Sequence, residues 1–181
     1  ESGVLRTLIT LSSLYHDSGK YRDSLALTRQ SFLLADRLAV EETWTVTCYN
    51  VAANSFRALD LSVAALEFQL AAVRLAEKAH HPQTIARYYV QLGLLYERLR
   101  DFDTAIKHIQ TGLAEGEKFQ KSATEQDIRS YGLLHLGRVL RRAGRNEEAL
   151  RTLGEAEQFY QGKGWEALSY LITKERFLAQ M

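Results

Sequence analysis

Residues 88–114 read YYVQLGLLYERLRDFDTAIKHIQTGLA, and the placing of small residues in this stretch decides the fold. Tyr96 follows Gly93 by three residues, and Gly112 follows Ala105 by seven. The apolar residues recur at helical spacing and show none of the sustained alternation of a strand. Small residues at matched places on two consecutive helices let those helices approach closely, while an aromatic ring fills the space beside them. The stretch therefore predicts two closely packed helices.

The same pattern recurs four times along the chain. The small residue of the first helix is Ser12, Ala53, Gly93 and Gly137, at steps of 41, 40 and 44 residues. A bulky residue follows three positions later, at Tyr15, Phe56, Tyr96 and Leu140. We align the two small residues of the second helix as Ser24 and Ser31, Ala64 and Ala71, Ala105 and Gly112, and Ala149 and Ala156. On this alignment the turn of the second copy, around Asp60, is one residue shorter than the others.

The pattern of leucine-glycine, a tyrosine three positions on and then two spaced small residues resembles the tetratricopeptide repeat family. The resemblance covers roughly residues 5–161. It implies an all-α fold, an α-α superhelix of the tetratricopeptide solenoid kind, with four helix-turn-helix repeats plus a C-terminal helix. The period of about 41 residues exceeds the usual value of about 34. It is similar to that of the long-repeat branch, which includes kinesin light chains.

We expect one solenoid domain over 1–181, with repeats at about 5–38, 44–79, 84–119 and 128–161 and a terminal helix over 164–181. Short side chains that can accept from free backbone amides predict helix starts at Ser62, Asp103 and Asn146. The chain begins with Glu1 and its only methionine is Met181, so we expect a fragment of a longer protein. The terminal helix is either a cap or the first helix of a truncated fifth repeat, and we favour truncation.

The composition excludes several classes of function. The formal net charge of +1 favours neither nucleic acid nor an anionic membrane surface as a partner. The chain lacks the 18 or more consecutive apolar residues of a membrane span. Cys48 is the single cysteine, so the chain forms no internal disulfide, and we expect a cytoplasmic location.

No residue pattern indicates catalysis. No two of the five histidines have the three- or four-residue spacing that places metal ligands on one helical face. Cys48 lacks the sequence context of a nucleophile, and we expect it to be a small buried residue. The glycines form no phosphate-binding loop. We therefore predict a protein that is not an enzyme and that has no metal site and no cofactor.

The predicted first helices carry eight arginines against two acidic residues, Asp17 and Glu97. In the tetratricopeptide family the first helix of each repeat lines the concave surface, so the resemblance implies a basic groove that binds a peptide or protein segment. The carboxylate clamp by which co-chaperones of the family hold acidic C-termini is absent, because Asn50, Tyr131 and His135 stand where the clamp needs lysine or arginine. The candidate groove residues are Asn50, Asn54, Arg57, Arg87, Gln91, Arg98, Tyr131, His135, Arg138, Arg141 and Arg142.

Asn50 and Asn54 lie four residues apart, and their amides can donate to and accept from an extended peptide backbone. Arginines can add bidentate contacts to carboxylates. Alternatively, the asparagines bond within the chain, and Arg141, Arg142 and Arg145 interact with a helix C-terminus or pair with Glu147 and Glu148. Arg138 and Arg142 occupy no repeat core position, so we expect reversal of their charges to spare the fold.

Two functions agree with these features. The first is a non-catalytic interaction scaffold whose groove holds an acidic or extended segment of another protein. The alternative is the regulatory or sensor region of a larger bacterial signalling protein or transcription activator. A homodimer through the terminal helix 164–181 is a third arrangement, and the sequence leaves these open.

Overall fold

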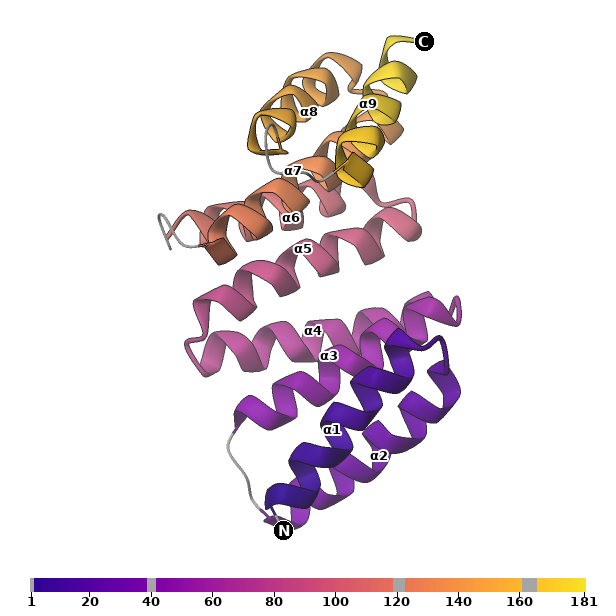
Figure 1. Cartoon of the computed structure of the whole chain (residues 1–181), viewed down its shortest axis with the longest axis vertical. Coiled ribbons are helices and arrows are strands. Elements are labelled where there is room, and N and C mark those ends of the chain that lie inside the picture. Colours follow the sequence, from indigo (N-terminus) through magenta and orange to yellow (C-terminus); the bar gives the residue numbers. More distant parts are fainter. Residues whose placement is uncertain (1, 39–41, 119–122, 161–165) are drawn as a thin grey trace. The chain divides into compact units, whose positions relative to one another are not determined.

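The structure, a computed structural model, describes residues 2–38, 42–118, 123–160 and 166–181. These residues form nine α-helices and no strand, so the all-α prediction is confirmed (Figure 1). Successive helices run antiparallel in pairs. The helices are α1 (Ser2–Asp17), α2 (Tyr21–Leu38), α3 (Glu42–Ala58), α4 (Ser62–Lys78), α5 (Pro82–Arg98), α6 (Phe102–Glu117), α7 (Ala123–Arg142), α8 (Asn146–Tyr160) and α9 (Glu166–Gln180).

The helix boundaries lie close to the predicted ones, with three corrections. Helix α7 begins at Ala123, five residues before the predicted start of the fourth repeat. The N-cap of α6 is Asp101 rather than Asp103, and its carboxylate accepts a hydrogen bond from the backbone N–H of Thr104 at 3.2 Å. Ser62 is the first residue of α4 and not its N-cap. The N-cap is Leu61, whose side chain makes no capping hydrogen bond.

All four turns inside the repeats have the same length and geometry. One residue in each turn has a positive φ, namely Gly19 (75°), Asp60 (61°), Arg100 (63°) and Gly144 (78°). The next residue donates its backbone N–H to the carbonyl of the bulky repeat residue, as Leu61 does to Phe56 and Asp101 to Tyr96. The expectation of a shorter second turn is therefore wrong.

The equal turns shift the register of the second repeat by one residue. Ala65 and Ala72 are fully buried, whereas Ala64 and Ala71 are half-buried. Ala65 follows Ala53 by 12 residues, the same step as in the other three repeats. The small residues of this second helix are therefore Ala65 and Ala72, and our alignment at Ala64 and Ala71 was wrong.

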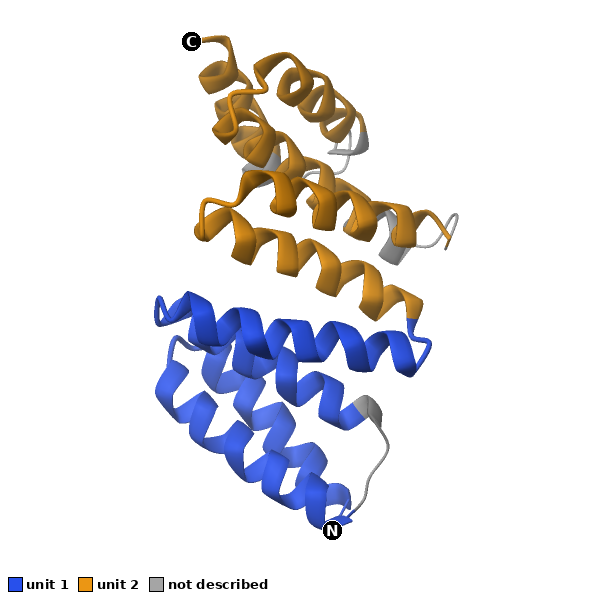
Figure 2. Cartoon of the chain, turned by 180° about the vertical axis from the view of Figure 1, so that it is seen from behind, with its two compact units in different colours: residues 1–81 blue, residues 82–181 orange. Residues whose placement is uncertain are grey.

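The chain divides into two compact units, residues 1–81 and 82–181 (Figure 2). The prediction of a single domain over 1–181 remains a prediction. In unit 1, helices α1, α2 and α3 enclose a core that includes Leu5, Ile9, Ala35 and Cys48. Cys48 is 1% exposed, which confirms that it is a small buried residue.

Serines stand at the repeat positions of the first helix pair, and each satisfies its hydroxyl group internally. Ser24 Oγ donates to the backbone carbonyl of Ser12 at 2.7 Å and lies 3.0 Å from Ser55 Oγ. Ser55 Oγ in turn lies 3.1 Å from His16 Nδ1. A polar chain thus joins α1, α2 and α3, and it explains how serine replaces alanine in this repeat, because a buried hydroxyl is tolerated when it is hydrogen-bonded.

In unit 2, glycines allow the backbones of α5 and α6 to approach closely. A Cβ atom at Gly112 would lie 2.7 Å from the carbonyl oxygen of Ala86, and one at Gly93 would lie 2.8 Å from that of Ala105. Neither backbone oxygen can move aside cheaply, so the sequence requires glycine at both positions. Helices α7 and α8 repeat this pairing, and α9 packs on both of them.

Candidate functional site

In unit 1 the candidate residues lie on α3. Asn50, Asn54 and Arg57 are all partly exposed, and their spacing of four and three residues puts them on one face of the helix. The Asn54 side-chain oxygen accepts a hydrogen bond from Arg57 Nη2 at 3.3 Å. The alternative of internal bonding therefore holds for Asn54. The side-chain oxygen of Asn50 is buried and accepts no hydrogen bond from the described residues.

In unit 2 the candidates on α5 differ in exposure. Arg87 and Arg98 are exposed, while Gln91 between them is half-buried. On α7 the ring of Tyr131 meets that of His135 edge to face, with centroids 4.2 Å apart. Tyr131 is 41% exposed, so this pair of rings forms a polar surface that is partly open to solvent.

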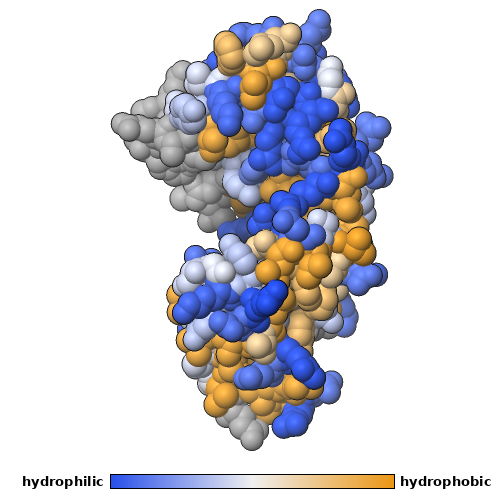
Figure 3. All heavy atoms as spheres, turned by 90° about the vertical axis from the view of Figure 1, so that its right-hand side faces the viewer, coloured by the Kyte–Doolittle hydropathy of each residue, from blue (hydrophilic) through white to orange (hydrophobic). Residues whose placement is uncertain are grey.

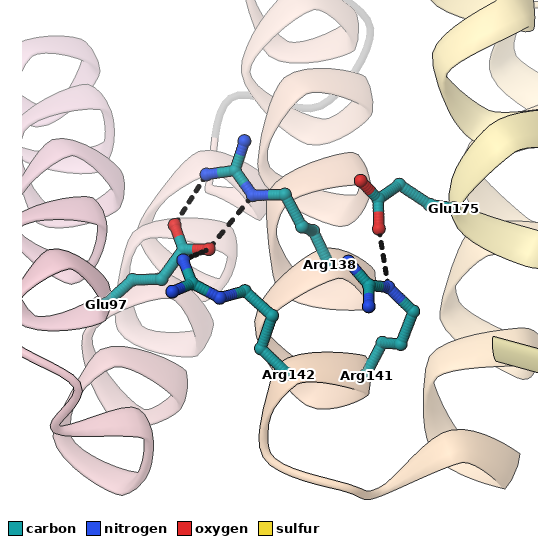
Figure 4. Close-up of polar contacts among 5 residues, drawn as sticks. All are labelled: Glu97, Arg138, Arg141, Arg142 and Glu175. Carbon is teal, nitrogen blue, oxygen red and sulfur yellow. Dashed lines mark hydrogen bonds and ion pairs between the residues drawn. The ribbon is translucent and has the colours of Figure 1, made fainter. Parts of the chain in front are cut away.

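The arginines near the end of α7 are only partly exposed to solvent and form ion pairs with other helices. Arg138 makes a two-pronged contact with Glu97 of α5, from Nε at 3.0 Å and from Nη2 at 2.5 Å (Figure 4). Arg142 reaches the same carboxylate from Nη1 at 2.8 Å. The Glu97 side chain is only 3% exposed, whereas Arg138 and Arg142 are 32% and 38% exposed. Two half-exposed guanidinium groups thus neutralise one buried carboxylate.

The balance of forces on Glu97 favours its charged form. Burial raises the pKa of the Glu97 carboxyl, but the hydrogen bonds and charges of Arg138 and Arg142 outweigh it and leave the pKa below its ordinary value. Removing both arginines would strand a buried carboxylate, which is costly. The expectation that these arginines are dispensable for the fold is therefore wrong. Glu97 is one of the two acids of the predicted first helices, but its pairing with Arg138 spans 41 residues, and no local sequence pattern predicts it.

The third arginine of this helix, Arg141, has a different partner. Its Nε donates to Glu175 of α9 at 2.7 Å, and both side chains are largely buried (Figure 4). Arg145 pairs with Glu148 at 2.6 Å, as the alternative interpretation expected for one of its two named acids. Arg138, Arg141 and Arg142 therefore hold helices together, and the excess of arginines over acids overstates the basic charge of the surface.

The described residues offer little for catalysis. They hold no group of three or more His, Cys, Asp and Glu side chains suited to a metal ion. Burial raises the pKa of the Cys48 thiol to about 11, so a thiolate nucleophile is disfavoured at neutral pH. Burial also lowers the pKa of His16 and of His108, the latter stacked on Tyr96 with centroids 5.2 Å apart. Both imidazoles are packed components of the helix pairs.

No helix among the described residues is both long enough and apolar enough to cross a membrane.

Comparison with known proteins gives a family for part of the chain. Residues 86–114 match the family model described as tetratricopeptide repeat. This segment covers most of α5 and α6 and includes nearly the same residues as the stretch 88–114. No curated protein matches the chain.

Solved structures share the fold across nearly the whole chain. Aspartyl phosphate phosphatase F from Bacillus subtilis is 16% identical with a TM-score of 0.83, over 97% of this chain and 44% of its own. A signal transduction ATPase with numerous domains from Pyrococcus horikoshii, which has a tetratricopeptide repeat sensor, is 12% identical with a TM-score of 0.75, over 96% of this chain and 25% of its own. YrrB, a tetratricopeptide repeat protein with an unusual peptide-binding site, is 16% identical with a TM-score of 0.59, over 95% of this chain and 79% of its own.

At these identities the likeness concerns the fold alone, and the chain spans less than half the length of the first two proteins. Three observations indicate the same helical repeat: the helix pairs, the small residues repeated along them and the segment that matches the family model. The chain carries a tetratricopeptide repeat at residues 86–114 and has the all-α fold of tetratricopeptide repeat proteins.

Proposed function

We propose that the chain is a non-catalytic interaction scaffold that binds extended segments of a partner protein on the first helices of its repeats. These are α1 and α3 in unit 1, and α5 and α7 in unit 2, and the proposal applies to each unit by itself. Tetratricopeptide repeat domains are usually non-catalytic, and YrrB has a peptide-binding site. The repeat steps of 41, 40 and 44 residues support membership of the long-period branch of the family. Cys48 is a single buried cysteine with no partner in this sequence for a disulfide, which supports a cytoplasmic setting.

The observation that carries this proposal is the amide of Asn50. Its side-chain oxygen is buried and has no hydrogen-bond donor among the described residues, although Asn50 as a whole is partly exposed. An unsatisfied buried acceptor costs about 1–3 kcal/mol, so a ligand gains affinity by supplying a donor once the side chain turns its oxygen outward. The backbone N–H of an extended peptide is such a donor, and Asn54 lies one turn further along the same face.

The exposed arginines of this chain favour an acidic partner. Arg87 and Arg98 are exposed on α5, and the cluster of Glu97, Arg138 and Arg142 keeps a net positive charge. Acidic side chains of a bound segment would therefore be favoured in unit 2. This attraction between exposed charges should weaken as salt rises, because it is screened beyond about 8–10 Å at physiological ionic strength.

The test starts from peptides selected for binding to the whole chain from a displayed random library. Their affinities are then measured for the wild type, for the double variant Asn50→Ala with Asn54→Ala, and for the control Gln110→Ala with Gln158→Ala. The control also removes two amides, but from exposed sites on the second helices α6 and α8. The proposal expects a loss of about tenfold or more only in the asparagine variant, with an unchanged salt dependence. Equal affinities for all three proteins would refute it.

The arginines need a separate variant. Arg87→Ala with Arg98→Ala should weaken acidic peptides and flatten their salt dependence, because it removes exposed charge without touching Glu97. Reversing Arg138 and Arg142 is unsuitable, because it would place three carboxylates together around a buried site. If the peptides selected from the library are not enriched in Asp and Glu, the proposed preference for acidic segments is contradicted.

A second candidate is a sensor region within a larger signalling protein. The fold likeness to the Pyrococcus horikoshii protein with a tetratricopeptide repeat sensor favours it. A kinase, cyclase, nucleotide-binding or DNA-binding domain in the same polypeptide would support this candidate. The sequence of the whole gene product decides the matter.

A homodimer through α9 also remains part of the proposal. Tyr170 and Phe177 lie seven residues apart on α9 and are 68% and 63% exposed. Two exposed aromatic side chains on one helical face can contribute to an interface between copies. Light scattering of the wild type and of Tyr170→Ser with Phe177→Ser tests this, and a monomeric wild type would exclude it.

A further inference from the structure

Unit 1 also contains an apolar hollow of about 400 Å³, which is lined mainly by α2, with two residues of α3 and one of α4. Its volume falls within the range of about 300–1,000 Å³ that is typical of binding pockets. Two lining residues, Thr28 and Ala52, are almost completely buried. The remaining lining residues are Leu25, Ala26, Arg29, Phe32, Phe56 and Phe68.

Aromatic rings from three helices shape this hollow. Phe68 of α4 packs against Phe56 of α3 and Phe32 of α2, with ring centroids 5.1 and 6.2 Å away. All three rings are only half-buried, so each leaves part of its face uncovered. Incompletely covered aromatic surface of this kind is a common anchor point in protein interfaces.

Two stripes of side chains that reach the hollow differ in charge. Exposed residues at helical spacing on α2 form one stripe, Arg22, Ala26, Arg29 and Leu33, of which Ala26 and Arg29 line the hollow. Half-buried residues at the same spacing on α4 form the other, Ala64, Phe68, Ala71 and Leu75, of which Phe68 lines it. Figure 3 shows the molecule from the right-hand side of Figure 1, which is the side on which α2 lies. In this view, apolar and hydrophilic surface alternate over unit 1. Arg29 is the one charged residue that lines the hollow.

We infer that this hollow is a docking site for an acidic amphipathic helix of another protein. One or two large apolar side chains of that helix enter the hollow, and carboxylates on its flanking turns face Arg22 and Arg29. A helix is favoured over an extended segment, because the hollow is lined by helices whose backbone groups are already bonded internally. An extended ligand would find few backbone partners there, whereas a helix satisfies its own backbone groups.

A second copy of this chain is a poorer occupant. The exposed apolar residues at its C-terminal end are Tyr170 and Phe177 on α9 and Met181 after it, and the exposed Lys174 lies between the two aromatic residues. Lys174 would bring a positive charge towards Arg22 and Arg29, and like charges disfavour an interface. The basic rim therefore selects an acidic partner, and the site is separate from the Asn50 and Asn54 face of α3.

The test uses a fluorescein-labelled helical peptide with leucines at positions i and i+4 and glutamates on the flanking turns. Two control peptides carry serine in place of the leucines or lysine in place of the glutamates. Fluorescence anisotropy should show binding of the parent peptide alone to the wild type. Ala26→Trp should abolish that binding, because Ala26 is exposed and its indole would fill the hollow from the rim. Arg29→Glu should weaken it about tenfold or more.

Matched controls are Ala114→Trp, an exposed alanine of α6, and Arg151→Glu, an exposed arginine of α8, and neither should change the affinity. Circular dichroism checks that every variant keeps its helix content. Undiminished binding to Ala26→Trp, or equal binding of the serine peptide, would overturn the site. A dimer in light scattering that Ala26→Trp dissociates would make a second copy the occupant and overturn the proposed partner.

The peptide should not compete with library-selected peptides that depend on Asn50 and Asn54. Competition would mean that the two sites are one, and it would overturn the separate docking site. Each proposal can therefore fail while the other stands.

Discussion

Arg100 occupies a backbone conformation that L-amino acids disfavour. Its φ is 63°, and the equivalent residues of the first and fourth turns are Gly19 and Gly144. A residue with a Cβ atom in the left-handed region costs about 1–2 kcal/mol relative to the right-handed one, whereas glycine is free of this cost. The turn needs this conformation because the next residue, Asp101, donates its N–H to the carbonyl of Tyr96.

We therefore predict that Arg100→Gly stabilises the chain by about 0.5–1 kcal/mol and that Gly144→Ala destabilises it by about 1 kcal/mol. Urea unfolding followed by circular dichroism measures both changes. The control Arg151→Gly lies inside α8 and should lose about 1 kcal/mol, because glycine weakens a helix interior. A lower urea midpoint for Arg100→Gly would contradict this interpretation of the turn.

Glu97 makes the stability of unit 2 depend on pH. Because Arg138 and Arg142 hold its pKa below the ordinary value of 4.5, the stabilisation is present above about pH 4.5 and is lost as pH falls through the lowered pKa. Glu97→Gln should be less stable than the wild type near neutral pH by about 1–3 kcal/mol, since an amide is a weaker acceptor for two guanidinium groups.

The difference between wild type and Glu97→Gln should narrow as urea unfolding is repeated below about pH 4.5. Glu148→Gln is the control, because Glu148 also pairs with an arginine but lies at the surface, where removing a carboxylate changes stability little. A difference that stays constant down to strongly acidic pH would show that Glu97 does not stabilise the fold through its charge.

At the scale of the helix pair, the register of α4 decides which alanine touches its neighbours. Ala65 is fully buried and lies 12 residues after Ala53, while Ala64 is half-buried. Leucine at Ala65 adds volume at a close contact between helices, and such overpacking costs about 1–3 kcal/mol. Leucine at the partly exposed Ala64 can extend toward solvent.

We predict that Ala65→Leu lowers the urea midpoint markedly and that Ala64→Leu leaves it nearly unchanged. The two variants have the same composition and differ by one position, so each controls for the other. The reverse ranking would restore the alignment that places Ala64 at the repeat position.

At the scale of the whole molecule, the fold could be predicted because close helix contacts demand small residues at fixed intervals. Gly93, Gly112 and Gly137 show this demand plainly, and the helix ranges followed from them. The register of α4 was missed because adjacent alanine pairs, 64–65 and 71–72, look alike in a sequence, although the constant step of 12 residues would have separated them. The pairing of Glu97 with arginines more than 40 residues away depends on the packing of α5 on α7, which no local pattern encodes.

Packing within each unit joins helices that are near neighbours in the chain. From α1 to α4 in unit 1 and from α5 to α9 in unit 2, each helix contacts the next one. Contacts one step further join α1 with α3, α5 with α7 and α7 with α9. In repeat proteins stability is therefore close to a sum of terms from single repeats and from neighbouring repeats. A lesion in one place should loosen nearby helices more than distant ones.

Hydrogen exchange measured amide by amide on Ala65→Leu tests this expectation. Amides of α3 and α4 should exchange faster than in the wild type, because Ala65 packs within that pair, while those of α8 and α9 should keep their protection. The free energy of local opening should change by about 1–3 kcal/mol in α3 and α4, which is the expected cost of overpacking. Uniform loss of protection from α1 to α9 would show instead that the chain unfolds as one cooperative body, and the additive description would then be wrong for this molecule.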